Sequence, residues 1–115
     1  MKIEIRTLLG KNCMTREDGQ IVYDRIHAEL LAEHSIELDF EGVEIFASPF
    51  FNFAIGQLLK DIEPDSLNRL LKISNLNPVS KPILKRVIEN SKKYYSDSEY
   101  RSKVDKVIEE QATSA

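Results

Sequence analysis

The sequence predicts an α/β fold in which a small, mostly parallel β-sheet has helices mainly on one face. Short segments of alternating apolar and polar residues are separated by longer segments whose apolar residues recur every three or four positions. This order of strand and helix, repeated three times, is typical of parallel strands joined by helices. Because the strands alternate instead of being apolar throughout, one face of the sheet is expected to lie open.

The first third of the chain predicts a strand, a turn and a long helix. Residues 2–6 alternate isoleucine with charged side chains, and residues 10–12 read Gly-Lys-Asn, a turn sequence. A helix is predicted over residues 15–33, with Thr15 as its N-cap and two acidic residues in its first turn. Gly19 weakens the start of this helix. The residues expected to face the core are Val22, Ile26 and Leu30.

The middle of the chain predicts a strand followed by a second helix. Residues 36–40 alternate, and residues 43–46 form an extended connection. A helix then begins at Ser48-Pro49, because a proline at the first helical position lacks only an N–H that would have no helical partner. Ser48 would be the N-cap of this helix. Its core-facing stripe comprises Phe51, Ala54, Ile55, Leu58, Leu59 and Ile62.

The last part predicts one more strand and helix. A bend at residues 63–65 leads into a third strand at 71–76, and a helix follows over 79–93. The α/β domain would therefore span residues 1–95. Residues 96–115 form an extension, predicted as an amphipathic C-terminal helix that is marginal on its own. The inward residues of the helix at 79–93 would be Val79, Ile83 and Val87, with Tyr94 just beyond, and the extension carries Tyr100, Val104, Val107, Ile108 and Gln111 on one face.

The alternation also divides the strand residues between two sheet faces. The open face would carry charges of mixed sign, which neighbouring strands tolerate. The open face is assigned Glu4, Arg6, Glu37, Asp39, Lys72 and Ser74, and the covered face Ile3, Ile5, Ile36, Leu38, Phe40, Leu71 and Ile73.

The composition excludes several classes of function and partner. The chain has 115 residues, 16 Lys and Arg against 19 Asp and Glu, and a net charge of −3. Proteins that bind nucleic acid over their whole surface usually carry a basic excess, so no nucleic-acid partner is expected. Cys13 is the single cysteine, which excludes an internal disulfide and fits a reducing cytoplasm. The longest apolar stretch, residues 43–59, is interrupted by polar groups, so no membrane span is predicted.

The sequence offers little for catalysis. Cys13 precedes a predicted helix and could act as a nucleophile with His27 or His34 as base, but neither histidine has an evident orienting partner. The four glycines form no phosphate-binding or dinucleotide-binding motif. No spacing of His, Asp and Glu indicates a metal site. We therefore expect no enzyme activity, no metal and no cofactor.

A basic stretch stands out in the second half. Residues 69–93 hold seven basic side chains and one acidic, Glu89. Lys81, Lys85 and Lys92 fall on one face of the predicted helix. This face could bind an anion or an acidic partner, or it could be a solvated helix face with basic groups near the helix C-terminus.

The helix that begins at Ser48 carries aromatic residues outside its core-facing stripe. At 100° per residue, Phe53 lies almost opposite Phe51, beside Asn52, and Phe50 lies on the flank. Large aromatic side chains outside the buried stripe suggest a contact surface. Alternatively, the C-terminal segment or a second copy of the chain covers them.

This arrangement resembles the STAS-like family, the relatives of bacterial anti-sigma-factor antagonists. The resemblance rests on residues 36–51, Ile-Glu-Leu-Asp-Phe-Glu-Gly-Val-Glu-Ile-Phe-Ala-Ser-Pro-Phe-Phe, in which a strand, a connection and a helix start follow one another. The strand ending at residues 73–77 and the helix after Pro78 are further similar pieces. The resemblance covers about residues 1–95.

In antagonists of this type, an Asp-Ser-Ser-Gly-like turn opens the helix and its second serine is phosphorylated by a partner kinase. At the matching positions this chain has Ala47, Ser48, Pro49 and Phe50. Proline has no hydroxyl, so the phosphoswitch is not preserved as written, and Ser48 is the substitute acceptor. As an N-cap, however, its hydroxyl would already bond a backbone N–H.

The resemblance implies a non-catalytic regulatory module of the bacterial cytoplasm that binds another protein. We expect its partner-binding residues to be Ser48, Pro49, Phe50, Asn52 and Phe53. The partner would be a regulator such as an ATPase-type kinase, and the chain could also form a homodimer. The alternative is a small-ligand or anion sensor that uses the same helix start together with Lys81 and Lys85.

Overall fold

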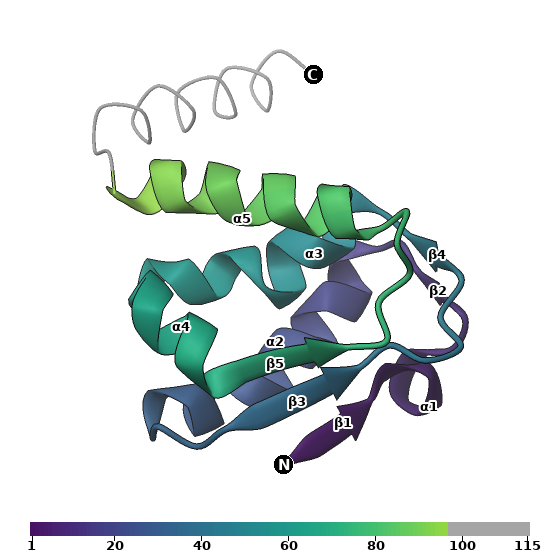
Figure 1. Ribbon diagram of the computed structural model, residues 1–115, viewed down its shortest axis with the longest axis horizontal. Helices are drawn as coiled ribbons and strands as arrows, with labels where there is room; N and C mark the ends of the chain where they lie inside the picture. The colour runs from purple at the N-terminus through teal and green to yellow at the C-terminus, as the bar shows by residue number, and fades with distance from the viewer. Residues whose placement is uncertain (97–115) are drawn as a thin grey trace.

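The computed structural model describes residues 1–96 and has the predicted α/β architecture (Figure 1). The predicted C-terminal helix lies outside the described residues. In chain order the elements are β1 (Lys2–Glu4), α1 (Ile5–Leu9), β2 (Asn12–Cys13), α2 (Arg16–Leu31), β3 (Ile36–Asp39), β4 (Ile45–Phe46), α3 (Ser48–Ala54), the 3₁₀ helix η1 (Gly56–Lys60), α4 (Pro64–Leu70), β5 (Leu71–Ser74) and α5 (Lys81–Ser96).

All strand pairs of the described chain are parallel. The main sheet has the order β1-β3-β5, and β2 and β4 form a separate two-stranded ladder. In the main sheet Ile3, Leu38 and Ile73 lie in register on the covered face. The next positions, Glu4, Asp39 and Ser74, lie side by side on the open face. The predicted division between two faces is therefore confirmed for the residues within these strands, whereas Ile5 and Arg6, assigned to the first strand, lie in α1.

The helices lie mainly on one side of the main sheet. Figure 1 shows α2 behind the sheet, α3 and η1 beside α2, and α5 across the outside of α3 and η1. α3 therefore packs against two helices, α2 on one side and α5 on the other. None of the described helices is both long and apolar enough to cross a membrane.

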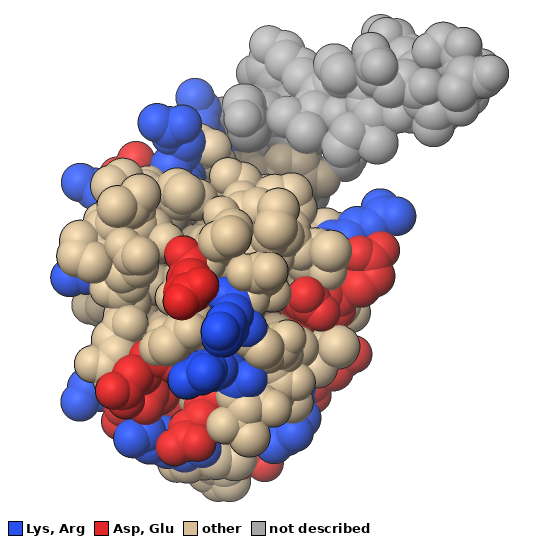
Figure 2. Space-filling model, turned by 90° about the vertical axis from the view of Figure 1, so that its right-hand side faces the viewer, with Lys and Arg blue, Asp and Glu red and all other residues tan. Residues whose placement is uncertain are grey.

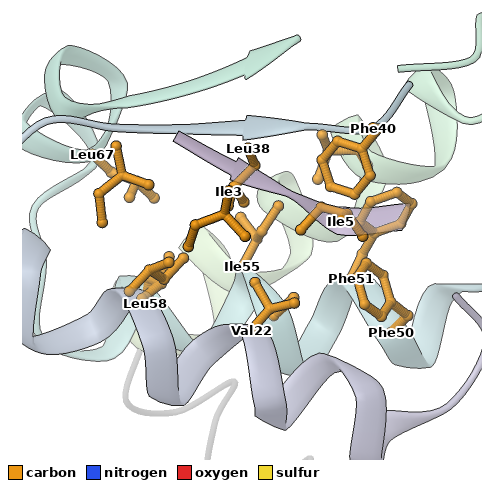
Figure 3. Close-up of a cluster of buried hydrophobic side chains, with 14 of the residues drawn as sticks. Ile3, Ile5, Val22, Leu38, Phe40, Phe50, Phe51, Ile55, Leu58 and Leu67 are labelled. Atoms are coloured by element: carbon orange, nitrogen blue, oxygen red, sulfur yellow. The ribbon is translucent and has the colours of Figure 1, made fainter. Parts of the chain in front are cut away.

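The core lies between the sheet and the α2–α3 layer. Figure 3 shows side chains from β1, β3, α2 and α3 meeting in this layer. Phe40, Phe50 and Phe51 are its largest fully buried side chains, and their rings contact one another at centroid distances of 5.5–6.5 Å. Burying a phenylalanine side chain stabilises a fold by about 1.5–3 kcal/mol. This aromatic group therefore fixes the place where β3 and α3 meet.

The long helix α2 follows its sequence prediction closely. The Thr15 hydroxyl accepts a hydrogen bond from the Asp18 N–H at 3.1 Å, as expected of an N-cap. Val22, Ile26 and Leu30 are buried as predicted. Gly19 has a further role, because a Cβ at this position would lie 2.5 Å from the backbone oxygen of Phe50.

Four local predictions are wrong. The first strand ends at Glu4, and residues 5–9 form α1, which ends at Gly10 with φ +97°. The residues read as a bend at 63–65 begin α4, for which Pro64 and Asp65 in the first turn are ordinary start signals.

The other two errors concern helix bounds. The helix from Ser48 ends at Ala54, and the chain continues as η1, although every residue of its predicted stripe is buried. Val79, predicted to face inward, is 77% exposed. It lies before α5, in a turn where the Asn77 side chain accepts a hydrogen bond from its N–H.

Candidate functional site: the α3-start surface

The start of α3 is held in place by the small ladder of β2 and β4. Asn12 pairs with Ile45 and Cys13 with Phe46, and the Ala47 N–H donates to the Cys13 carbonyl at 3.1 Å. Ala47 is extended, with φ −134° and ψ 153°, and is the N-cap of α3. The chain then enters the helix at Ser48. The first residues of α3 are thus fixed from both sides.

Three of the predicted binding residues reach the surface here. Ser48, Pro49 and Asn52 are exposed. No side chain caps α3, so the prediction that Ser48 is the N-cap is wrong. The reason given against modification of Ser48, that capping occupies its hydroxyl, therefore does not apply.

The two predicted aromatic contacts lie elsewhere. Phe50 is fully buried against Phe40 and Phe51, so its assignment to an exposed flank is wrong. Phe53 is half-buried. A Cβ on Gly19 would lie 2.9 Å from the Phe53 Cβ. Helix α2 therefore packs against the side of α3 that carries these residues, and neither the C-terminal segment nor a second chain is needed for that.

Two exposed apolar residues escaped the sequence prediction. Met14 is 49% exposed and Ile45 is 48% exposed. Met14 directly follows the Cys13 that bonds Ala47, and Ile45 is in β4, two residues before Ala47. The sequence predicts only an extended connection over residues 43–46, because a two-residue parallel ladder leaves no periodic signal in a sequence. We define the α3-start surface as Met14, Ile45, Ser48, Pro49 and Asn52.

Figure 2 faces the end of the molecule where β2, β4 and the start of α3 lie. Uncharged side chains form a continuous area in the upper half of this view, and lysine, arginine, aspartate and glutamate gather below it. The connection from β5 to α5, which carries the exposed Val79, runs along the same end (Figure 1). The α3-start surface consists of exposed, uncharged residues and belongs to the elements at this end of the molecule.

The Cys13 thiol lies directly beneath this surface and is fully buried. Burial, with a smaller effect of the nearby Asp18 carboxylate, raises the pKa of Cys13 to about 12. A catalytic thiol needs the opposite shift, since the thiolate is the nucleophile.

Both histidines do have acidic partners, contrary to the sequence reading. His27 Nε2 lies 2.8 Å from Asp61 Oδ2, and His34 Nδ1 lies 2.7 Å from Glu29 Oε2. The ring of Tyr23 also stacks on His27 at 4.7 Å. His27 lies about 16 Å along α2 from the start of the helix that follows Cys13. The arrangement therefore supplies no nucleophile–base pair.

Lys81, Lys85 and Lys92, the three lysines predicted to share one helix face, line one hollow of about 350 Å³. No residue of α3 lines this hollow. The predicted anion site, which combined the start of α3 with Lys81 and Lys85, is therefore not a single site. The lining residues of the hollow are Leu76, Lys81, Leu84, Lys85, Ile88, Glu89 and Lys92.

The open face of the sheet carries a polar cluster around Asp39. Its Oδ1 accepts hydrogen bonds from the Asn75 side chain at 2.9 Å and from the Glu41 N–H at 3.0 Å, and Lys2 Nζ lies 3.4 Å from Oδ2. The Asn75 bond, followed by the Glu41 bond and Lys2, lowers the pKa of Asp39. Within residues 1–96 no three His, Cys, Asp or Glu side chains gather as metal ligands would.

Comparison with known proteins agrees with the fold. Neither the curated proteins nor the solved structures include a significant match to this chain. A family model described as a STAS-like domain of unknown function (DUF4325) matches residues 18–81, from the start of α2 to the start of α5. The match covers more than half of the chain and includes β3, α3 and β5, so this chain belongs to the family of STAS-like domains.

Proposed function

We propose that this domain is a non-catalytic regulatory module that binds another protein through the α3-start surface. The observation that carries the proposal is the exposed, uncharged patch of Met14, Ile45 and Pro49 on a well-packed base. Exposed apolar groups gathered at one place are typical of protein-binding surfaces. The raised pKa of the buried Cys13 argues against a hydrolase or transferase that uses this thiol.

The base of the surface favours binding without rearrangement. Phe46 stacks on Phe51 at 5.2 Å and meets Phe40 edge-on at 5.3 Å, so the ladder and the start of α3 rest on the same aromatic group. A partner therefore meets a preformed surface and loses little free energy to ordering it. Its complementary face should be apolar and weakly charged. The partner that the family resemblance implies is an ATPase-type kinase or another regulator in the bacterial cytoplasm.

Ser48 gives this surface a means of regulation. Ser48 is exposed at the first position of α3, and its side chain does not cap the helix. A phosphate would bring a charge of about −2 into an otherwise uncharged interface. Removing that charge from water on docking would be unfavourable, so phosphorylation of Ser48 would release the partner.

The test compares two exposed residues of nearly equal exposure at different places. The immobilised full chain retains a specific protein from the native host, and Ile45→Lys and Asn52→Arg should abolish that retention. Leu31→Lys is the matched control, because Leu31 is 50% exposed at the end of α2. Ser48→Glu should weaken binding in the same direction, and with the purified partner Ile45→Lys should weaken it about tenfold or more. Equal retention by the Ile45→Lys and Leu31→Lys variants would refute the proposal.

One observation favours a second candidate, an anion sensor at the lysine hollow. Lys81, Lys85 and Lys92 line it together with the apolar Leu76, Leu84 and Ile88 and one acidic residue, Glu89. A small anionic ligand with an apolar part would match this lining. Inorganic phosphate, nucleotides and organic acids can be screened by thermal shift, since a ligand that binds the folded state raises Tm. A Tm increase that Lys81→Ala and Lys85→Ala abolish would favour this function.

A further inference from the structure

β1 is an outer strand of the main sheet, and its second edge is unpaired within residues 1–96. It pairs with β3, and the Glu37 N–H donates to the Met1 carbonyl at 2.8 Å. In a parallel ladder, alternate residues direct their backbone groups to the same neighbour. Met1 and Ile3 therefore face β3, while Lys2 and Glu4 direct theirs to the free edge. Natural proteins protect such edges with short strands and charged side chains, and β1 has both, since it is three residues long and carries Lys2 and Glu4.

The free edge adjoins a hollow and an apolar stripe of α2. The hollow, about 390 Å³, is lined by residues 1–4, by Thr7 and Leu8 of α1, and by Arg25 of α2. Arg25 thus shows which side of α2 borders the edge. Ile21, Ala28 and Ala32 lie on that same side at helical spacing, and all three are exposed, Ile21 to 44%. Exposed apolar residues in a stripe beside an open strand indicate an interface.

The charges of β1 indicate what the interface binds. Side chains of Lys2 and Glu4 lie on the open face of the sheet, with Ile3 between them on the core side. If a second β1 lies antiparallel, with a two-fold axis at Ile3, Lys2 stands directly opposite the partner's Glu4, and Glu4 opposite the partner's Lys2. Residues directly opposite in an antiparallel pair contact each other on one face. The strand is thus complementary to itself.

The same register suits the backbone of the free edge. The Glu4 N–H can donate to the carbonyl of the partner's Lys2, whereas the Glu4 carbonyl, at the N-cap of α1, already accepts a bond within that helix. A parallel pairing would instead oppose like charges. On the other side of the sheet the two α2 helices would meet across the axis, bringing Ile21 and Ala28 together and Arg25 near the partner's Asp24.

We propose that two copies of this chain associate through β1 and α2 into a two-fold dimer with one continuous β-sheet. Such an interface uses the same patch on both subunits, as two-fold dimers require. It includes no residue of the α3-start surface, so each dimer would present two docking surfaces at once. The dimer is independent of the proposed function, and either can fail alone.

The test is a charge exchange followed by sedimentation velocity of the full chain over a range of concentrations. The wild type should sediment as a dimer of twice 13.2 kDa. Lys2→Glu leaves only acidic groups on β1, and Glu4→Lys leaves only basic groups. Each substitution acts twice in the dimer, so it should raise the dimer dissociation constant about tenfold or more. An equal mixture of the two variants should restore the dimer as a heterodimer.

Two further variants keep the test decisive. Lys2 also pairs with Asp39, so if Lys2→Glu fails to fold, Glu4→Lys and Ile21→Asp decide, and both should dimerise about tenfold or more weakly than the wild type. Glu89→Lys, on α5, makes the same charge change as Glu4→Lys away from the interface and should stay dimeric. A monomeric wild type at every concentration overturns the proposal, as does a dimer dissociation constant that Glu4→Lys and Ile21→Asp leave unchanged.

Discussion

Two buried titratable groups, Cys13 and Asp39, show how differently the two regions of this domain are stabilised. Cys13 lies beneath the α3-start surface among apolar side chains, and burial raises its pKa to about 12. Asp39 is 5% exposed on the open sheet face, where hydrogen bonds from Asn75 and Glu41 lower its pKa. Burial alone disfavours a charge, whereas burial with donors retains it. The α3 region is thus stabilised by packing and the open face by a polar network.

The largest expected effect comes from the packed region. Phe50→Ala should lower the free energy of unfolding by about 3–5 kcal/mol, because it removes a fully buried ring that contacts Phe40 and Phe51. The matched control is Phe46→Ala, since Phe46 belongs to the same aromatic group but is only half-buried. Urea denaturation of the two variants measures the difference. Equal losses would mean that burial does not distinguish the two rings.

The prediction for Phe50 also shows what the sequence could and could not reveal about the site. Helical periodicity correctly identified the stripe from Phe51 to Ile62 as buried. The same periodicity assigned Phe50 to an exposed flank, because a helix that packs only against a sheet has a single buried stripe. α3 instead lies between α2 and α5 and has further buried sides. Periodicity describes one helix at a time, so contacts between helices distant in sequence escaped it.

A second substitution tests how closely the packed region is fitted. Gly19→Ala should destabilise the fold by about 1–3 kcal/mol, since the new Cβ would meet the Phe50 carbonyl and the Ala54 nitrogen, which are backbone atoms. At an exposed helix position the same change stabilises by about 1 kcal/mol. The sign of the change in unfolding free energy therefore distinguishes a tightly packed Gly19 from an exposed one. Thermal and urea unfolding measure it. A more stable Gly19→Ala variant would show that α2 and α3 separate without cost.

Gly19 also shows which features of the fold could not be predicted from the sequence. The sequence identified the three strands of the main sheet, the helices α2, α3 and α5 between and after them, and the Thr15 cap, all of which depend on residues near in sequence. It treated Gly19 only as a weak helix former, because its close approach to α3 is a tertiary contact. The β2–β4 ladder escaped for the same reason: two-residue strands have no period.

The polar region should respond to pH in the opposite direction from the packed one. The pKa of Asp39 is lowered from its ordinary value of 3.8, so its stabilising effect is present above that value and is lost as pH falls below it. Asp39→Asn should therefore be less stable than the wild type at neutral pH, and the difference should narrow in acid. Asp65→Asn, an exposed change on α4, is the charge-matched control. A constant difference between pH 7 and 3 would contradict the assignment.

The last prediction changes no residue and probes the packed region through its thiol. The pKa of Cys13 is raised from 9.0 to about 12, so its thiolate fraction at pH 8 falls about a thousandfold. A thiol reagent should therefore modify the folded chain at least that much more slowly than the unfolded chain. The shift also means that the free energy of unfolding decreases as pH rises above 9.0, where the unfolded thiol ionises and the folded one does not. Labelling with an aromatic disulfide, followed by the absorbance of the released aromatic thiolate with and without denaturant, measures the ratio. Fast labelling of the native protein would place Cys13 in a frequently opened region, and the preformed base assumed for the α3-start surface would then be wrong.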